Sequence, residues 1–305
     1  MRRFDFKTLA ASAVAAIFAS GAYAGAVLAP DSDEELRPTG KGWGERAQPG
    51  HANPHGSPNT NGINYHGGPL ILGTTNVYYI WYGNWSNNTA STILTNLATS
   101  IGGSSYFNIN TTYYNANSAT VTNSVHYAGS TPDNYSHGTA LSDSGVQGVV
   151  SDAITSGSLP KDTNGVYFVL TSSDVNETSG FCTQYCGWHT HGTINGSDIK
   201  YSFVGNPDRC PSACEAQPTG PNGNAGADGM ASIISHELEE AVTDPDLNAW
   251  YDRRGEENAD KCAWTFGTTY TAANGALANM SLGGLNYLIQ RNWVNASGGY
   301  CSVSY

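Results

Sequence analysis

The segment 228–245 limits the possible folds of this chain more than any other, because it combines an apolar helical stripe with several ionisable residues. The apolar residues recur at helical spacing and form one face, namely Met230, Ile233, Ile234, Leu238 and Ala241. Asp228 is a suitable N-cap, and Pro245 ends the pattern because the residue before a proline avoids the helical region. The spacing predicts a helix over 228–242 that packs into the core of a domain.

This predicted helix carries an H-E-x-x-E motif. His236 and Glu240 are four residues apart and therefore share a face, while Glu237 lies beside the apolar stripe. A carboxylate in that position needs a proton or a partner, and a divalent metal ion is such a partner. In H-E-x-x-H helices both histidines bind zinc and the glutamate is the general base. Zinc also accepts a carboxylate oxygen at a similar distance, so we predict that His236 and Glu240 bind Zn²⁺ and that Glu237 is the catalytic base.

A second acidic segment offers a third ligand. Glu257 and Asp260 are three residues apart, so both can face one direction on a helical turn. A third ligand on a separate element leaves the fourth tetrahedral position open to water. Two other interpretations remain open. The His and Glu residues could be exposed or ion-paired on an ordinary amphipathic helix, or the acidic turn could bind Ca²⁺ through Asp244, Asp246 and Asp252.

Two histidines earlier in the chain are further candidate ligands. His189 and His191 are two residues apart, and such residues point the same way in a strand. A loop held by disulfides could direct either imidazole toward the metal. The alternative interpretation is that both are polar groups on the surface.

The first 24 residues have the anatomy of a secretory signal peptide. A basic start is followed by an apolar run over 9–19, and residues 22–24 match the small-x-small cleavage pattern. The run is shorter than the roughly 20 apolar residues that span a bilayer, and no later run is longer. We therefore predict cleavage near Ala24, a secreted or extracellular protein and no membrane span.

Six cysteines fit the oxidising compartment that a signal peptide implies. Two pairs have C-x-x-x-C spacing, and the last two cysteines lie far apart. We predict the bridges Cys182–Cys186, Cys210–Cys214 and Cys262–Cys301, although six cysteines allow about 15 pairings. Four of the cysteines could instead bind zinc, but their spacing is wider than the usual C-x-x-C.

Strand and helix patterns alternate along the chain after a leader at 25–62, which is rich in proline and glycine and which we interpret as disordered or as a propeptide. The predicted helices cover 91–101, 142–154 and 228–242, and the predicted strands cover 76–82, 119–127, 166–170, 199–204 and 287–294. Alternation of this kind predicts one α/β or α+β domain over 63–305, with a central mixed sheet flanked by helices and stabilised by disulfides.

Composition excludes several classes of protein. The chain has 13 Lys plus Arg against 25 Asp plus Glu and a formal net charge of -12, which is unsuitable for binding nucleic acid. It also lacks a G-x-S-x-G elbow, a phosphate-binding G-x-x-x-x-G-K loop and a dinucleotide fingerprint. A peptidase-like site would act on a peptide, and a non-catalytic protein of this kind would bind a component of the cell wall or extracellular space. The sequence carries no signal for an oligomeric state.

Several motifs together resemble the phosphate-induced protein 1 or EXORDIUM-like family of secreted proteins. They are 65–70, 76–85, 166–172, 228–230, 236–240 and 248–251, with Cys182, Cys186, Cys210, Cys214, Glu257, Asp260 and Cys262. The resemblance implies an extracellular protein of the kind linked to growth and brassinosteroid response in plants. The order of elements before the H-E-x-x-E helix is also similar to that of zincin peptidases.

Two functions follow from these observations. The first is a secreted zinc-dependent peptidase-like protein, in which Glu237 deprotonates a metal-bound water that attacks a peptide carbonyl. The alternative is a non-catalytic extracellular or cell-wall binding or signalling protein with a structural metal site. In that protein, tryptophans could stack on sugars, and the candidates are Trp81, Trp85, Trp188, Trp250 and Trp293.

Overall fold

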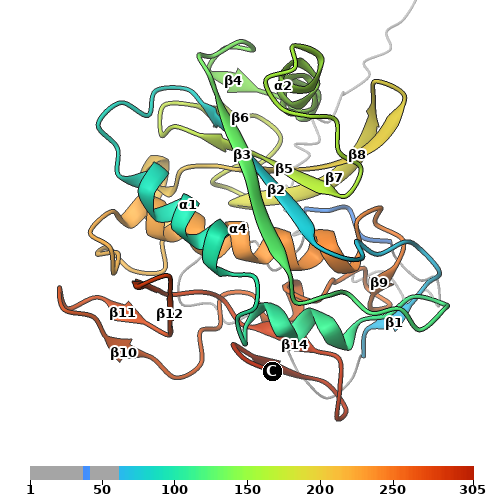
Figure 1. The fold of residues 1–305 in the computed structure, drawn as a ribbon. Helices are drawn as coiled ribbons and strands as arrows, with labels where there is room; N and C mark the ends of the chain where they lie inside the picture. Colours follow the sequence, from blue (N-terminus) through green and yellow to red (C-terminus); the bar gives the residue numbers. More distant parts are fainter. Residues whose placement is uncertain (1–36, 42–61) are drawn as a thin grey trace, which may run out of the picture. The chain divides into compact units, whose positions relative to one another are not determined.

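A five-stranded mixed sheet lies at the centre of the computed structural model, which describes residues 37–41 and 62–305 (Figure 1). Its strand order is β3 (Val125–Asp133), β2 (Thr75–Tyr82), β5 (Gly165–Thr171), β8 (Ser197–Val204) and β7 (Gly187–Ile194). The first four strands are parallel, and β7 runs antiparallel to β8 at one edge. The predicted α+β class with a central mixed sheet is confirmed.

Helices cover both faces of this sheet (Figure 1). Helices α1 (Ala90–Ser100) and α4 (Ala225–Thr243) contact each other on one face, where the Tyr79 hydroxyl donates to the carbonyl of Leu94. Helix α2 (Asp143–Thr155) packs on the opposite face, where the Tyr167 hydroxyl donates to the carbonyl of Pro160. The sheet is therefore buried on both sides, which explains why every residue of β5 is buried.

The remaining elements are short. They are β1 (Asn64–Tyr65), η2 (Phe107–Thr112), β4 (Ala140–Leu141), β6 (Asn176–Glu177), η3 (Pro207–Arg209), α3 (Pro211–Cys214), β9 (Trp250–Tyr251), η4 (Asp260–Cys262), β10 (Tyr270–Thr271), β11 (Leu277–Ala278), β12 (Met280–Leu282), β13 (Leu285–Tyr287), β14 (Asn292–Val294) and β15 (Tyr300–Ser302). All of the short strands pair two by two, outside the central sheet.

Two predicted strands are wrong in their bounds. The strand expected at 119–127 lies at 125–133, where the sheet edge tolerates Pro132 because that strand pairs on one side only. The strand expected at 287–294 is split into β13 and β14. Between them, Ile289 N donates to Asn279 Oδ1 and Gln290 N to Ser232 Oγ, so side chains replace the strand ladder.

Helix α4 is longer than predicted and is buried on almost every side. It begins three residues before Asp228, because the Asn224 side chain is the N-cap and accepts a hydrogen bond from Ala227 N at 3.0 Å. Asp228 lies in the first turn and accepts two hydrogen bonds from Asn222. The helix ends at Thr243, two residues before Pro245, as the sequence predicts.

Two of the three predicted disulfides are wrong. The bridges are Cys182–Cys210 and Cys186–Cys214, with Cα–Cα distances of 5.8 and 5.6 Å, whereas Cys262–Cys301 is confirmed. Cys210 and Cys214 flank a helical turn, so both side chains face the same way and meet the 182–186 segment across the gap. All six cysteines are bridged, which excludes the alternative in which four of them bind zinc.

The described residues lie within one compact unit, Glu35–Tyr305. The predicted signal peptide lies outside the described residues, and the predicted leader is described only at 37–41 and at Gly62. Residues 37–41, the short blue segment in Figure 1, contact the edge strand β7, where His189 N donates to the carbonyl of Gly40 at 3.1 Å. This stretch of the leader therefore lies against the domain.

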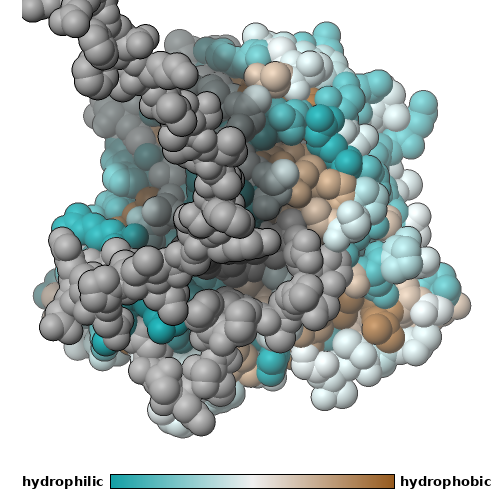
Figure 2. All heavy atoms as spheres, turned by 180° about the vertical axis from the view of Figure 1, so that it is seen from behind, coloured by the Kyte–Doolittle hydropathy of each residue, from teal (hydrophilic) through white to brown (hydrophobic). Residues whose placement is uncertain are grey.

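The surface carries both hydrophobic and hydrophilic residues. On the face shown in Figure 2, hydrophobic residues form patches among hydrophilic and intermediate ones. The exposed large hydrophobic side chains of the described part are Tyr114, Tyr270, Leu277, Tyr300 and Tyr305, and isolated exposure of this kind is ordinary. None of the helices among residues 37–41 and 62–305 has the length and hydrophobicity to cross a membrane.

Candidate metal centre

The H-E-x-x-E motif lies on the buried C-terminal half of α4. His236 Nε2 is 3.1 Å from Glu240 Oε1, one helical turn away, as the i, i+4 spacing predicts. The two side chains are 0% and 2% exposed. The interpretation in which these residues lie on an exposed helix face is therefore wrong, because α4 is enclosed on almost all sides.

The acidic segment after β9 meets this helix. Asp260 begins the short helix η4, and its backbone N–H donates to Glu240 Oε1 at 3.1 Å. Its Oδ1 lies 3.7 Å from His236 Nε2, and its Oδ2 accepts a hydrogen bond from Glu257 N at 3.2 Å. The structure thus brings together the four residues that the sequence predicts as ligands, because η4 is hydrogen-bonded directly to the helix.

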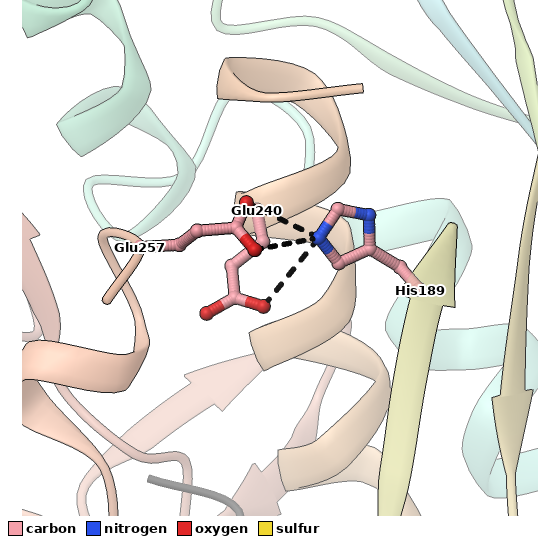
Figure 3. Close-up of side chains that lie close together, drawn as sticks. All are labelled: His189, Glu240 and Glu257. Atoms are coloured by element: carbon pink, nitrogen blue, oxygen red, sulfur yellow. Dashed lines mark hydrogen bonds and ion pairs between the residues drawn. The ribbon is translucent and has the colours of Figure 1, made fainter. Parts of the chain in front are cut away.

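His189 reaches the same cluster from β7 (Figure 3). Its Nε2 is 3.2 Å from both carboxylate oxygens of Glu257 and 3.7 Å from Glu240 Oε2. His191 does not reach it, because two residues along a strand move the side chain by more than 6 Å. His191 instead pairs with Asp198 at 2.8 Å, and Lys200 neutralises Asp198 and Asp246 there.

Glu240 is shared between two groups of possible ligands. Its Oε1 faces His236 and Asp260, and its Oε2 faces His189 and Glu257. Within each group of three residues the ligand atoms lie within 4.8 Å of one another. Imidazole nitrogens and carboxylate oxygens at this separation are the donors that zinc accepts in proteins.

Burial shifts the pKa values of two residues in the cluster. It raises the pKa of Glu257 well above its ordinary value, and the charges of Glu240, Asp244, Asp260 and Glu237 raise it further. Burial also lowers the pKa of His189 to about 3, with smaller effects from His236 and His191. Within the described chain neither Glu257 nor Asp260 pairs with a Lys or Arg side chain. A divalent cation would offset the free-energy cost of burying these carboxylates close together.

Glu237 lies beside the cluster and is fully buried. A Cβ placed at Gly187, the first residue of β7, would be 3.3 Å from Glu237 Oε1 and 2.5 Å from Ile233 Cγ2. The carboxylate thus lies close to the backbone at the start of the edge strand. Sequence reasoning missed Gly187, since a single glycine among 36 carries no local signal for such a close approach.

The acidic residues proposed for calcium do not come together. Asp244 Oδ1 accepts backbone hydrogen bonds from Asn248 and Ala249, which closes the turn after α4. Asp252 pairs with Lys261 at 3.0 Å, and Asp246 pairs with Lys200 at 3.0 Å. Each carboxylate has its own partner in a different place, so this calcium site is not formed.

Most of the tryptophans proposed to stack on sugars are in the core. Trp188, Trp250 and Trp293 are at most 3% exposed. Trp81 and Trp85 are half-buried and pack edge to face at 5.3 Å. An open platform of stacked rings is therefore not formed by the three buried tryptophans.

The comparison with family models agrees with the motifs quoted above. Residues 63–290 match the model described as "Phosphate-induced protein 1 conserved region". The chain belongs to the phosphate-induced protein 1 family. The matched range includes β7, the whole of α4 and all five residues of the cluster, so the candidate metal centre of this family member lies inside the family region.

Named relatives of this phosphate-induced protein 1 family member come from plants. It is 33% identical to Protein EXORDIUM-like 3 of Arabidopsis thaliana over 81% of this chain and 84% of that protein. It is 34% identical to Protein EXORDIUM-like 5 of Arabidopsis thaliana, over 78% and 77%, and 27% identical to Protein PHOSPHATE-INDUCED 1 of Nicotiana tabacum, over 65% and 69%. These relatives and the three disulfides are consistent with an extracellular protein. No solved structure matches the chain.

Proposed function

We propose that this chain is an extracellular zinc protein with a peptidase-like hydrolytic site. His236, Glu240 and Asp260 would hold Zn²⁺, and His189 and Glu257 would adjoin it on the other side of Glu240. The observation that carries the proposal is the convergence of two imidazole nitrogens on the two oxygens of Glu240, in a buried cluster with two further carboxylates. Burying these side chains together costs free energy when no cation is bound. Their nitrogen and oxygen atoms are suitable ligands for zinc.

Bound zinc supplies a Lewis acid and lowers the pKa of water near it. Glu237, next to His236 on α4, would be the general base that takes a proton from water. A carboxylate ligand in place of the second histidine leaves the cation less electrophilic, so catalysis would depend strongly on Glu237. Backbone donation from Asp260 N to Glu240 Oε1 orients the shared ligand.

The position of the edge strand β7 supports the hypothesis of a zincin-like site. An antiparallel edge strand, β7, lies beside the helix that carries the motif, and the two elements contact each other. An edge strand can bind an extended peptide through its free backbone groups. A peptide paired with β7 would run past His189, within reach of the cluster.

The rival function is a non-catalytic extracellular protein with a structural metal ion. It is favoured by burial, since the five side chains of the cluster are at most 2% exposed in the full chain. A structural site is closed, whereas a catalytic site keeps one position for water.

Metal analysis and a base variant separate these functions. Zinc titration of chelator-treated protein should show stoichiometric binding that is lost in His236→Ala. If the wild-type chain binds no metal stoichiometrically, the centre does not exist. If it binds zinc and cleaves no peptide library, while zinc raises its thermal stability, the structural role is correct. Loss of cleavage in Glu237→Gln at unchanged zinc content supports the peptidase.

A further inference from the structure

We propose that residues 37–41, called the strap below, occupy the peptide-binding edge of β7 and hold the site closed, and that this edge selects a basic side chain. The inference rests on the proposed function, because it names the substrate class and the regulation of the same site. Three contacts carry it. They join the strap to the edge strand, to the acidic loop and to the exposed carboxylate of Asp143.

The first contact is between Gly40 and the edge strand. The N–H of His189 donates to the Gly40 carbonyl at 3.1 Å, which is the type of bond by which a peptide adds to a sheet edge. Gly40 has a φ of +68°, and a Cβ built there would lie 1.9 Å from the His189 carbonyl oxygen. The strap backbone therefore approaches the residue whose imidazole faces Glu257 and Glu240.

The second contact joins the start of the strap to the loop that carries the acidic ligands. A Cβ at Gly255 would lie 2.9 Å from the Arg37 carbonyl oxygen and 3.2 Å from Pro38 N. Gly255 is two residues before Glu257 in the chain. Five residues thus extend from the acidic loop to β7, the same two elements whose side chains meet at the His189–Glu257 contact.

The third contact is an ion pair at the surface between Lys41 and Asp143, whose side chains are 26% and 52% exposed. The Lys41 Nζ donates to Asp143 Oδ2 at 2.5 Å and to Ser179 Oγ at 2.7 Å. The ammonium also lies 5.3 Å from the ring centroids of both Tyr185 and Trp188, a distance at which a cation is attracted to aromatic rings.

The exposed Asp143 carboxylate is held in a position suited to a positive charge. Burial alone would raise the pKa of Asp143, but hydrogen bonds from Lys41 and Ser179 outweigh it and hold that pKa below its ordinary value. Ser179 also donates to Asp143 Oδ1 at 2.7 Å and so fixes the carboxylate toward the incoming cation. A peptide that replaced the strap would therefore place Lys or Arg beside this carboxylate.

The strap is a segment of the leader, which makes it a removable occupant. Residues 42–61 connect it to the domain in the sequence. A cut in that stretch would break the covalent link between the strap and the domain that follows it. Displacement would then free the backbone edge of His189 and the Asp143 carboxylate for a peptide from outside.

The test uses the full chain with a substitution that displaces the strap. In Gly40→Val the side chain overlaps the His189 carbonyl, whereas Thr39→Ser keeps the exposed hydroxyl that accepts a hydrogen bond from Lys41 N and is the matched control. Lys41→Glu is a second variant, because it opposes Asp143 without altering the backbone. We expect hydrogen exchange at the His189 amide to rise at least tenfold in Gly40→Val and in Lys41→Glu, but not in Thr39→Ser.

The affinity of a synthetic peptide with the sequence of residues 36–42 tests whether displacement of the strap leaves a binding site. We expect it to bind Gly40→Val at least tenfold more tightly than the wild type, and to lose that affinity when its lysine is replaced by alanine. Equal exchange and equal peptide affinity in all variants would overturn the proposal. So would a large loss of thermal stability in Lys41→Glu without peptide binding, since the strap would then be a structural part of the domain.

The same measurements separate this inference from the proposed function. Exchange and peptide binding are recorded with and without chelator and do not require turnover. If both behave as expected but no variant cleaves peptides, the strap is the occupant of a binding site and the peptidase function fails. If zinc-dependent cleavage exists, the Gly40→Val variant should cleave peptides at least tenfold faster than the wild type. It should also prefer peptides that contain a basic residue.

Discussion

His189 Nε2 lies 3.2 Å from both carboxylate oxygens of Glu257, although 68 residues separate the two in the chain. The contact joins the edge strand β7 to the acidic loop after β9. Glu240 completes the group from α4, with its Oε2 3.7 Å from the same nitrogen. Three elements therefore meet at one imidazole, and the behaviour of the protein toward metal should depend on all three.

Removal of metal should lower stability. A ligand at about 1,000 times its Kd stabilises the folded state by about 4 kcal/mol, so chelator should lower the Tm by several degrees and zinc should restore it. Glu257→Gln should weaken zinc binding by more than tenfold, since it replaces a buried carboxyl group of the cluster with an amide that cannot ionise beside the cation. Calorimetry with and without chelator measures the shift, and the exposed variant Asp152→Asn is a control that should keep the wild-type response.

Glu237→Gln should separate binding from catalysis. The substitution keeps the size of a fully buried side chain and removes its ability to accept a proton. Zinc content should stay stoichiometric while peptide hydrolysis falls by about 10²–10⁴-fold, the usual contribution of a general base. Equal hydrolysis by the two proteins would remove Glu237 from the catalytic role.

Gly187→Ala should disturb the start of β7. The added methyl would be 2.5 Å from Ile233 Cγ2 and 2.9 Å from the Phe203 carbonyl oxygen, and overpacking of this kind costs about 1–3 kcal/mol. Gly145→Ala in α2 is the control, since its Cβ meets nothing closer than 3.5 Å and a helical alanine is favourable by about 0.5–1 kcal/mol. Urea unfolding should show opposite signs for the two variants, and the same sign for both would contradict the close approach.

Glu215 should make stability depend on pH. Burial, and then the charge of Asp208, raise the pKa of Glu215 from 4.5 to about 7. Between these values the folded state keeps a proton that the unfolded state has lost, so the free energy of unfolding falls as pH rises, by at most about 1.4 kcal/mol per pH unit. The stabilisation is complete below pH 4.5 and absent above pH 7.

Glu215→Gln should remove that dependence. Urea unfolding between pH 4.5 and 8 should give a flatter profile for the variant than for the wild type, with the variant more stable at pH 8. A profile parallel to that of the wild type would show that another group is responsible. Because Glu215 is not in any of the groups of possible ligands, zinc binding should be unchanged.

Local sequence patterns predicted the elements that lie at the centre of the domain. The runs at 76–82 and 166–170 are strands, and the 228–242 pattern is the core of α4, because side-chain periodicity reflects burial within each segment. The i, i+4 relation of His236 and Glu240 follows from helical geometry alone. Patterns failed at 119–127 and 287–294, where long-range partners decide the pairing.

The sequence by itself determined the long buried elements and the position of His236 and Glu240 on one face of a helix. It also determined which acidic residues could join them and the resemblance to one family. Each of these depends on neighbours in the chain. Only the tertiary structure decided that Cys182 pairs with Cys210, that His189 rather than His191 reaches the cluster, and that Gly187 lies against the helix. These contacts join residues 28 or more positions apart. Their formation depends on how α4, β7 and the acidic loop pack together, and local periodicity carries no information about that packing.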